Sequence, residues 1–198
     1  MTTTTTHFYA LRADGQDVAF DAVNSFGKAL QSAGLGKLNR EADENVSHGE
    51  RFRWTLKATG GTLEVVVHDD DTMPAMVLEV TGPAEILAGV LPLVKITFEI
   101  ARATEVIETA KHEQSEDPEM LVLAAWVAGE AEEAAMVKLL EAASQDAEME
   151  VRRGAAKAAA VQATPALRKL VEEMASRETD PKLASQLKKL LENWRPTR

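Results

Sequence analysis

The chain has 198 residues, enough for one sizeable domain or two small ones, and its 45% hydrophobic and 27% charged residues are typical of a folded globular protein. It contains no cysteine, which excludes disulfides, thiolate catalysis and cysteine-ligated zinc. The net charge is −10, with 11 Lys and Arg against 24 Asp and Glu in residues 1–145 and 11 against 8 in residues 146–198, so nucleic-acid binding is disfavoured except on the C-terminal part.

The N-terminal residues do not have the pattern of a targeting signal. Residues 1–6 carry five threonines and no basic residue, unlike a signal peptide, and we expect a flexible tail there. The longest apolar run, residues 86–94, has about half of the ~20 residues that a membrane helix needs, and it contains Pro92. We therefore expect a cytoplasmic protein with no membrane-spanning segment.

The first expected elements are a strand and a helix. Residues 7–13 are rich in strand-forming side chains, and Asp17 is a candidate N-cap of a helix that Gly34 and Gly36 end. The polar residues 36–49 show no sustained period, which predicts a loop. The apolar positions expected on one face of the helix are Val18, Ala22, Val23, Phe26, Leu30 and Ala33.

Residues 51–80 have the pattern of an antiparallel meander. Residues 51–58 alternate apolar and polar side chains, and Gly60 and Gly61 supply a hairpin turn before the next strand. An antiparallel sheet with one dry face needs a cover. We expect the preceding helix and another that starts near Ala84 to provide it.

Residues 84–111 have a helical pattern, with a kink or break expected at Pro92. The polar residues 114–118 are the expected junction between two regions. The stretch up to that junction therefore predicts an α+β domain over residues 7–113, with a small antiparallel sheet and covering helices. The apolar stripe expected along its last helix is Ile96, Ile100, Ala103, Ile107 and Ala110.

Beyond Asp117 the sequence is alanine-rich and helical throughout. Asp117, Asp146 and Asp180 each open a helix as candidate N-caps, at spacings of 29 and 34 residues, near the period of helical repeats. Between the last two, Thr164 and Pro165 restart the chain, and proline at the first helical position loses no hydrogen bond. The many alanines allow neighbouring helices to approach closely.

The middle of these units resembles a HEAT repeat. In its first helix Val151 and Arg152 follow Asp146 at the spacing of the repeat, and a pair of alanines comes next. In the preceding unit Leu123 stands where the pattern prefers arginine, and the last unit lacks a second helix. The residues that resemble the second helix of the repeat are Pro165, Leu167, Leu170 and Val171.

This resemblance implies a short all-α HEAT-like helical repeat array over residues 117–195, after the α+β domain at residues 7–113. HEAT-like arrays are stacked helix pairs that bind other macromolecules. We therefore expect a non-enzymatic adaptor or regulatory subunit that binds a protein through the array. The acidic N-terminal region suits a basic partner. The array is too short to form a long groove, so we expect it to dock into a larger protein assembly or to self-associate as a homo-oligomer.

The alternative is a HEAT-like nucleic-acid-binding or DNA-repair protein. HEAT-like DNA glycosylases hold DNA on a concave basic surface, which requires the basic residues of this array to share one face. Acidic residues interrupt the series, and the arginine of the repeat often pairs with one, so an ordinary charged surface is favoured. A pigment lyase, another HEAT-like role, is disfavoured by the missing cysteine. The residues of the basic ridge are Arg152, Arg153, Lys157, Arg168 and Lys169.

Trp194 and Arg195, near the C-terminus, are the other candidate partner-binding residues. Tryptophan and arginine are enriched among the residues that dominate binding energies. Trp54, by contrast, lies on the apolar face of a predicted strand, where core packing explains it. Trp126 lies on an alanine-rich helix.

The sequence contains no catalytic constellation, phosphate-binding loop or paired histidines, so we expect no enzyme and no cofactor. The acidic series Asp69, Asp70 and Asp71, preceded by His68, comes nearest to a set of hard-metal ligands. It lacks the alternate spacing, the glycine and the closing glutamate of an EF-hand, which favours an acidic turn with no metal. Cation binding by this turn stays open.

Overall fold

The computed structural model describes residues 3–13 and 15–195. The chain folds into two compact units, Met1–Arg102 and Ala103–Arg198. The first is an antiparallel sheet with two helices and the second is a run of helices, which confirms the α+β fold class. The division lies earlier than the junction expected between residues 113 and 117, because helix α3 (Ala103–Glu113) packs against α4 (Glu119–Val127).

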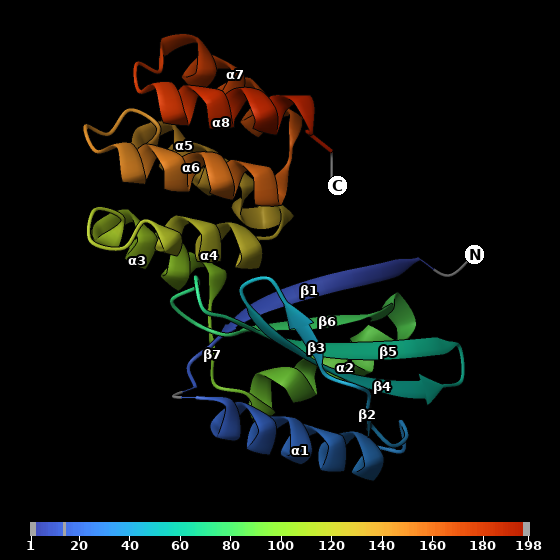
Figure 1. The fold of residues 1–198 in the computed structure, drawn as a ribbon. Helices are drawn as coiled ribbons and strands as arrows, with labels where there is room; N and C mark the ends of the chain where they lie inside the picture. The colour runs from blue at the N-terminus through green and yellow to red at the C-terminus, as the bar shows by residue number, and fades with distance from the viewer. Residues whose placement is uncertain (1–2, 14, 196–198) are drawn as a thin grey trace. The chain divides into compact units, whose positions relative to one another are not determined.

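The sheet of the first unit has seven strands in the described residues, and its pairs are antiparallel. Its order is β2-β4-β5-β6-β1-β7, with β3 also paired to β4 (Figure 1). β4, β5 and β6 form the expected meander. The strands are β1 (Thr4–Leu11), β2 (Asn39–Arg40), β3 (Glu44–Val46), β4 (Gly49–Ala58), β5 (Gly61–Asp70), β6 (Val77–Pro83) and β7 (Ile100–Ala101).

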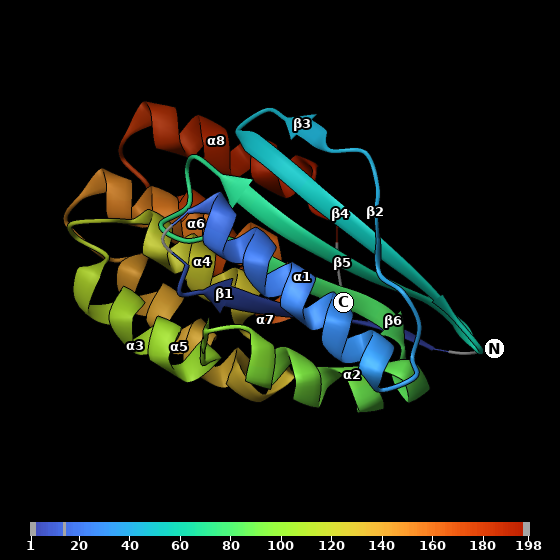
Figure 2. The ribbon, with the colours of Figure 1, turned by 90° about the horizontal axis from the view of Figure 1, so that it is seen from below.

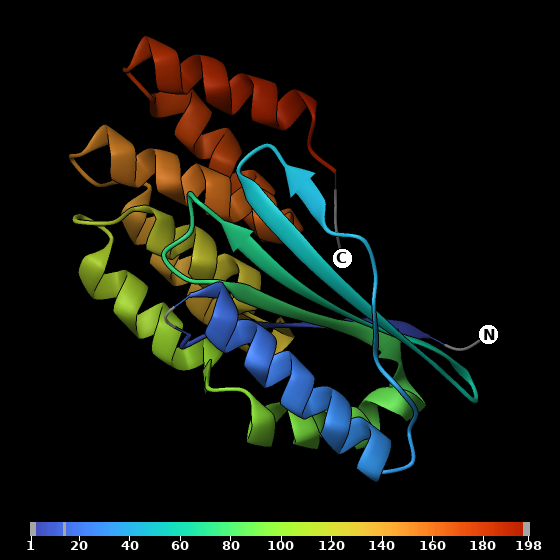
Figure 3. The same ribbon diagram turned by 60° about the horizontal axis from the view of Figure 1, so that its bottom comes forward.

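The hydrophobic core of this unit lies between one face of the sheet and the helices α1 (Gln16–Ser32) and α2 (Ala84–Thr97) (Figure 3). Alternation along β4 places Phe52, Trp54 and Leu56 on this face, each at most 5% exposed. Full burial of one large apolar side chain stabilises a fold by about 1.5–3 kcal/mol. The residues that α1 buries are Ala19, Val23, Phe26 and Leu30.

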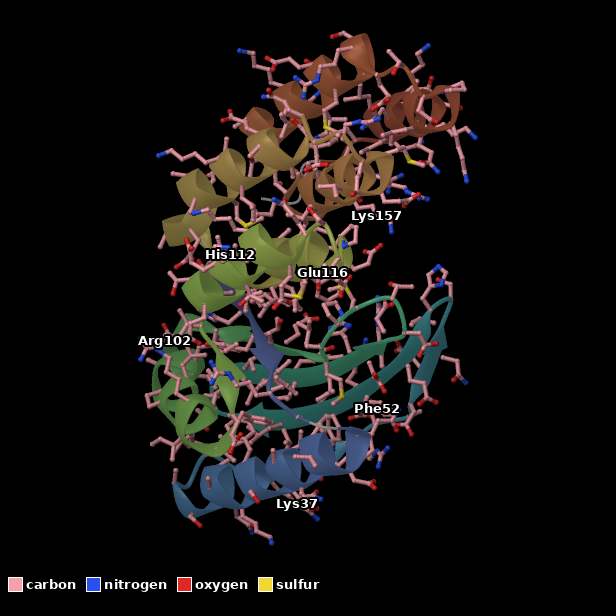
Figure 4. The ribbon with its side chains drawn as sticks, turned by 90° about the vertical axis from the view of Figure 1, so that its left-hand side faces the viewer. Lys37, Phe52, Arg102, His112, Glu116 and Lys157 are labelled. Carbon is pink, nitrogen blue, oxygen red and sulfur yellow. The ribbon has the colours of Figure 1, made fainter. Side chains whose placement is uncertain are left out.

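Residues 36–49, expected to be a loop, contain the short strands β2 and β3, which pair with the outer edge of β4. Arg40 of β2 also covers one end of the core, because its guanidinium carbon lies 5.0 Å from the centre of the Phe20 ring. Phe20 in turn contacts Phe52 edge to face, with ring centres 4.7 Å apart; Figure 4 labels Phe52 between β4 and α1. Tertiary pairing therefore orders a segment that has no internal period.

β1 begins at Thr4, so the expected tail over residues 1–6 is wrong for residues 4–6; residues 1 and 2 lie outside the described part. The cause is pairing with β6, which suits β-branched threonine. α1 is entered from Gly15, and Asp17 lies in its first turn instead of capping it. Two residues expected on its buried face are exposed, Val18 and Ala33.

The helix expected over residues 84–111 ends at Thr97, not at Pro92. Pro92 lies inside α2, and the chain then becomes extended at Phe98, which is buried against α1. β7 follows and pairs with the end of β1 before α3 begins. The single stripe expected through this segment is therefore wrong, and Ile96 is 81% exposed.

The second face of the sheet carries polar contacts between strands. His68 Nε2 on β5 lies 2.8 Å from Glu79 Oε2 on β6, and hydrogen bonding to His68 lowers the pKa of Glu79 below its usual value. Thr81 on β6 donates from Oγ1 to Oγ1 of Thr6 on β1 at 2.9 Å. These contacts link three neighbouring strands on the face opposite the core.

The helices of the second unit form two layers (Figure 1). In one layer α3 contacts α5 (Glu133–Ala143), which contacts α7 (Pro165–Arg177); in the other α4 contacts α6 (Met149–Gln162), which contacts α8 (Pro181–Glu192). Successive helices also contact each other, and a short 3-10 helix, Glu130–Glu132, leads into α5. α8 packs against α7, and no second helix follows it in the described residues, as expected for the last unit. None of the described helices is both long and apolar enough to span a membrane.

Aspartate side chains explain where one layer begins its helices. Asp180 is the N-cap of α8, and its Oδ1 accepts hydrogen bonds from the N–H groups of Lys182 and Leu183, both at 2.9 Å. Asp117 and Asp146 each accept from the N–H two residues ahead, at 3.1 and 2.9 Å. Those two residues lie just before the caps of α4 and α6, so the expected starts are correct to within a few residues.

α6 approaches α4 closely at Gly154. A Cβ atom at this position would lie 2.7 Å from the Pro118 carbonyl oxygen and 3.3 Å from Cδ1 of Leu121. The first distance leaves no room for a methyl group, because the contact is with backbone, whereas the end of the Leu121 side chain would have to shift only slightly. The missing side chain of Gly154 therefore sets the spacing between these two helices.

We expect Gly154→Ala to lower the free energy of unfolding of the helical unit by about 1–3 kcal/mol, because the added methyl overpacks the α4–α6 contact. Gly27→Ala in α1 is the matched control, since a Cβ there meets Leu38 Cβ at an ordinary 3.6 Å. This control should be neutral or stabilising by up to about 1 kcal/mol. Urea denaturation followed by circular dichroism measures both, and equal stabilities for Gly154→Ala and the unaltered chain would contradict the close contact.

Candidate functional site

Arg152, predicted to belong to a basic ridge, forms a nearly buried ion pair with Glu178. Its Nε and Nη2 donate to the two carboxylate oxygens of Glu178 at 2.8 and 2.9 Å, and the two side chains are 17% and 4% exposed. Its Nη1 donates to the carbonyls of Asp146 and Ala147, both at 2.9 Å. Arg152 therefore joins the turn before α6 to the turn between α7 and α8.

This ion pair borders a shallow pocket of about 460 Å³ in the helical unit. Arg177 also lies there, and its Nη2 donates to the backbone oxygen of Ser144 at 3.0 Å and to its Oγ at 2.7 Å. Because the charged side chains already bond to protein groups, we interpret the pocket as a structural joint between helix pairs. Its lining residues are Ser144, Gln145, Ala147, Arg152, Met174, Arg177, Glu178 and Thr179.

The ion pair has a marked effect on ionisation. The hydrogen bonds from Arg152 lower the pKa of Glu178 to about 2 from an ordinary 4.5, against the opposing effect of burial, and the backbone N–H groups of Asp180 and Thr179 add to the lowering. The same pairing raises the pKa of Arg152. A depressed carboxylate pKa stabilises the fold above the unfolded-state pKa, and this contribution is lost as the pH falls from about 4.5 to about 2.

The other four residues of the expected ridge also have carboxylate partners. Lys157, labelled in Figure 4, joins α6 to α4, and the remaining three are paired within their own helices. The structure does not bring the five basic residues together as an unpaired cationic surface. The four pairs are Arg153–Glu150, Lys157–Glu119, Arg168–Glu172 at 3.1 Å and Lys169–Glu173 at 3.8 Å.

The apolar stripe of α8 extends beyond the residues that the helical unit buries fully. Leu183 and Leu187 are each 1% exposed and pack into the helical unit. The stripe continues at helical spacing with Leu190 and Trp194, which are only half-buried, as is Leu191 beside them. Trp194, a predicted partner-binding residue, thus lies at the partly open end of this stripe, past the last turn of α8.

Three exposed cations lie near the open end of the stripe. At about 100° per residue, Lys188 lies beside the stripe and Lys189 on the opposite face of α8, and Arg195 follows the end of the helix. None of them has an ion-pair partner in the part of the chain that the structure describes, unlike the residues of the expected ridge. We call the following residues the α8 surface: Lys188, Lys189, Leu190, Leu191, Trp194 and Arg195.

The sequence indicated Trp194 and Arg195 as site residues, but it did not indicate the other four residues of the α8 surface. A signal was available. The leucines at 190 and 191 extend the stripe that begins at Leu183, and two consecutive lysines precede them. Because a last helix has no following neighbour, the C-terminal part of its apolar stripe is the part left partly open.

The acidic series after β5 has structural partners. Asp69 Oδ2 accepts from Gln16 Nε2 at 2.6 Å, and Asp70 Oδ1 accepts from both N and Oγ1 of Thr72, at 2.9 and 2.6 Å. Asp69 and Asp70 are the last residues of β5, and the turn starts after them. Among the described residues there is no group of three or more side chains placed to hold a metal ion.

Comparisons with known proteins leave the family of this chain open. No protein-family model matches it, and neither the curated proteins nor the solved structures gave a match. The function is therefore inferred from the residues and their geometry.

We expect Glu178→Gln to lower the free energy of unfolding by about 3 kcal/mol at pH 7, because it leaves Arg152 nearly buried without its counter-charge. The difference from the unaltered chain should shrink as the pH falls from about 4.5 to about 2, where Glu178 itself becomes protonated. Urea denaturation at several pH values measures this difference.

Glu172→Gln is the control for this measurement. Glu172 pairs with Arg168 on the exposed surface of α7, and an exposed pair contributes only about 0.3–0.5 kcal/mol. A Glu178→Gln variant no less stable at pH 7 than Glu172→Gln would contradict the joint between the helix pairs.

Proposed function

We propose that this protein is a non-enzymatic adaptor in which a HEAT-like array of helix pairs presents the α8 surface to an acidic segment of a partner protein. The observation that carries the proposal is the contrast in charge pairing. The basic residues of the expected ridge, on α6 and α7, have carboxylate partners, whereas those of the α8 surface have none among the described residues.

Two features support the HEAT-like part of the proposal. The helices alternate between two layers, and those introduced by Asp117, Asp146 and Asp180 share one layer. Arg152, the arginine of the repeat pattern, bonds to an acidic residue, Glu178 in the turn between α7 and α8, and such pairing is what the resemblance implies. In a stack of this kind each pair contacts only its neighbours, so a terminal pair always has one face without a neighbour.

The chemistry of the α8 surface suits a protein partner. Half-buried leucines and a tryptophan lose little side-chain entropy on binding, and they release water when covered. Cations around such an apolar centre speed the encounter with an acidic partner and select its orientation. The basic partner expected from the acidic N-terminal region would have to bind elsewhere, so we take the partner of this surface to be acidic.

Nucleic-acid binding has less support. It needs several unpaired cations that follow a phosphate backbone, and the five ridge residues are paired with carboxylates. The α8 surface has fewer cations and places them around apolar side chains, an arrangement that fits a protein segment better than a phosphate chain.

We expect a Lys188→Glu/Trp194→Ala variant to lose a protein that co-purifies stoichiometrically with the unaltered chain from its native cells. The double change reverses one flanking charge and removes the aromatic side chain. The matched control is Lys138→Glu/Trp54→Phe, which changes the same residue types on α5 and in the core of the sheet unit. Quantitative mass spectrometry of nuclease-treated eluates measures the loss.

Capture of the same partner by both variants would show that the α8 surface is not the binding site. Recovery of nuclease-sensitive nucleic acid in place of a protein would favour the alternative function. Circular dichroism spectra of the purified variants establish that both are folded before the comparison.

A further inference from the structure

Among the described residues, no strand pairs with the outer edge of β1 before Ala10. β1 pairs with β6 from Thr4 to Ala10, but on its other side β7 pairs with Ala10 and Leu11 alone in this part of the chain. Residues 4–6 are exposed. Residues 4–9 contain no charged residue, glycine or proline, the devices by which natural edge strands avoid pairing with other chains.

The two edges of the sheet differ in how far other strands pair with them. At the far edge, β2 and β3 pair with β4 and cover it. At the near edge, the N–H of Leu11 bonds to the Met76 oxygen on the β6 side, whereas the N–H of Arg12 bonds outward to the Glu99 oxygen. Because backbone groups alternate along a strand, those of Thr4 and Thr6 point outward, away from β6.

α2 starts beside this edge, packs against β6 and β5, and runs in the same direction as β1 (Figures 1 and 2). Its solvent side carries one charge near each end, Glu85 and Lys95, and neither has an ion-pair partner among the described residues. Small or apolar residues lie between them. Burial and, after it, the charge of Lys95 lower the pKa of His7 on β1. The exposed residues of α2 are Ala84, Glu85, Ala88, Gly89, Pro92, Lys95 and Ile96.

Thr6 on β1 and Val90 on α2 lie at the same level along the two elements. The N–H of Ala84 bonds to the Thr3 oxygen, so α2 and β1 start at the same level. Six residues of helix rise about 9 Å, the length of about three strand residues. Val90 is therefore level with Thr6. Val90 is also the midpoint between Glu85 and Lys95 in the sequence.

We propose that two copies of this chain pair through their β1 edges, antiparallel about a two-fold axis at Thr6, with Glu85 of each copy facing Lys95 of the other. Two-fold symmetry requires each contact to occur twice with the roles exchanged. An axis level with Val90 satisfies this for the two charges. The exposed Ala84 and Ile96 are related by the same axis, as are Ala88 and Pro92.

A second copy fits this edge because of its charge pattern. An uncharged strand meets its own copy without repulsion, and the only charges near the edge on α2 are opposite and self-complementary. Pairing extends the antiparallel sheet across both chains and satisfies the outward N–H and C=O groups of Thr4 and Thr6. The surface lies in the sheet unit and does not involve the α8 surface, so the two proposals stand independently.

Sedimentation velocity of the full chain over a range of concentrations tests the pairing. We expect a monomer–dimer equilibrium for the unaltered chain. For Lys95→Glu, which places like charges opposite each other, the dissociation constant of the dimer should rise about tenfold or more. The double variant Glu85→Lys/Lys95→Glu exchanges the two charges and should restore the dimer. Lys28→Glu, an exposed change on α1, should leave it unaltered.

Thr6→Pro tests the strand itself. It removes an outward N–H without breaking a backbone bond to β6, and the side-chain bond from Thr81 that it loses lies on the exposed face. Proline is tolerated at a strand edge, so we expect a folded monomer. A monomer at all concentrations for the unaltered chain would overturn the proposal. A dimer that Lys95→Glu does not weaken, or that the double exchange does not restore, would overturn it as well, independently of how Thr6→Pro folds.

Discussion

The ion pair between Arg152 and Glu178 is the contact on which the helical unit depends most. It joins α6 to the turn before α8, so it fixes α8 on the unit that α6 and α7 form. A buried ion pair adds little net stability compared with apolar residues, because both charges lose water, but the loss of one partner is costly. Its main contribution here is to fix the relative positions of the helices that it joins. Whatever α8 presents to a partner is held in place by this bond.

The same pair shows why the basic ridge could not be resolved from the sequence. Arginine after the repeat valine is compatible with an exposed cation or with a paired one. Its partner Glu178 lies 26 residues away, and the partner of Lys157 lies 38 residues away. The pairs within one helix, such as Arg168 with Glu172, follow from spacing alone. Pairs between helices depend on packing that a residue pattern does not encode.

Local signals located most elements, and tertiary contacts decided the rest. Asp180 and Thr164 bond to N–H groups of their own helices, so those starts are readable from a few residues. The end of α2 is different. Pro92 is a helix breaker by itself, yet α2 runs through it and stops where Phe98 packs against α1. The start of β1 depends likewise on its pairing with β6.

Both candidate surfaces arise where a regular structure stops. A stack of helix pairs leaves its last helix without a neighbour, and a sheet leaves its last strand with unpaired backbone groups. The sheet unit covers its β4 edge with β2 and β3 but not most of its β1 edge. The α8 surface likewise keeps cations without carboxylate partners among the described residues, unlike the five ridge residues of α6 and α7. The outward backbone groups of β1 and the cations of the α8 surface thus lack partners that comparable groups have elsewhere in the described residues.

The two surfaces would act together if both are used. A dimer through β1 carries two α8 surfaces, however the units of each chain are placed. A partner that presents two acidic segments then binds the second surface intramolecularly, and its overall affinity can exceed that of one segment by about 10²–10⁴-fold without any new contact. A weak α8 surface is therefore sufficient for selective binding, because recognition requires two acidic segments at the spacing that the dimer sets.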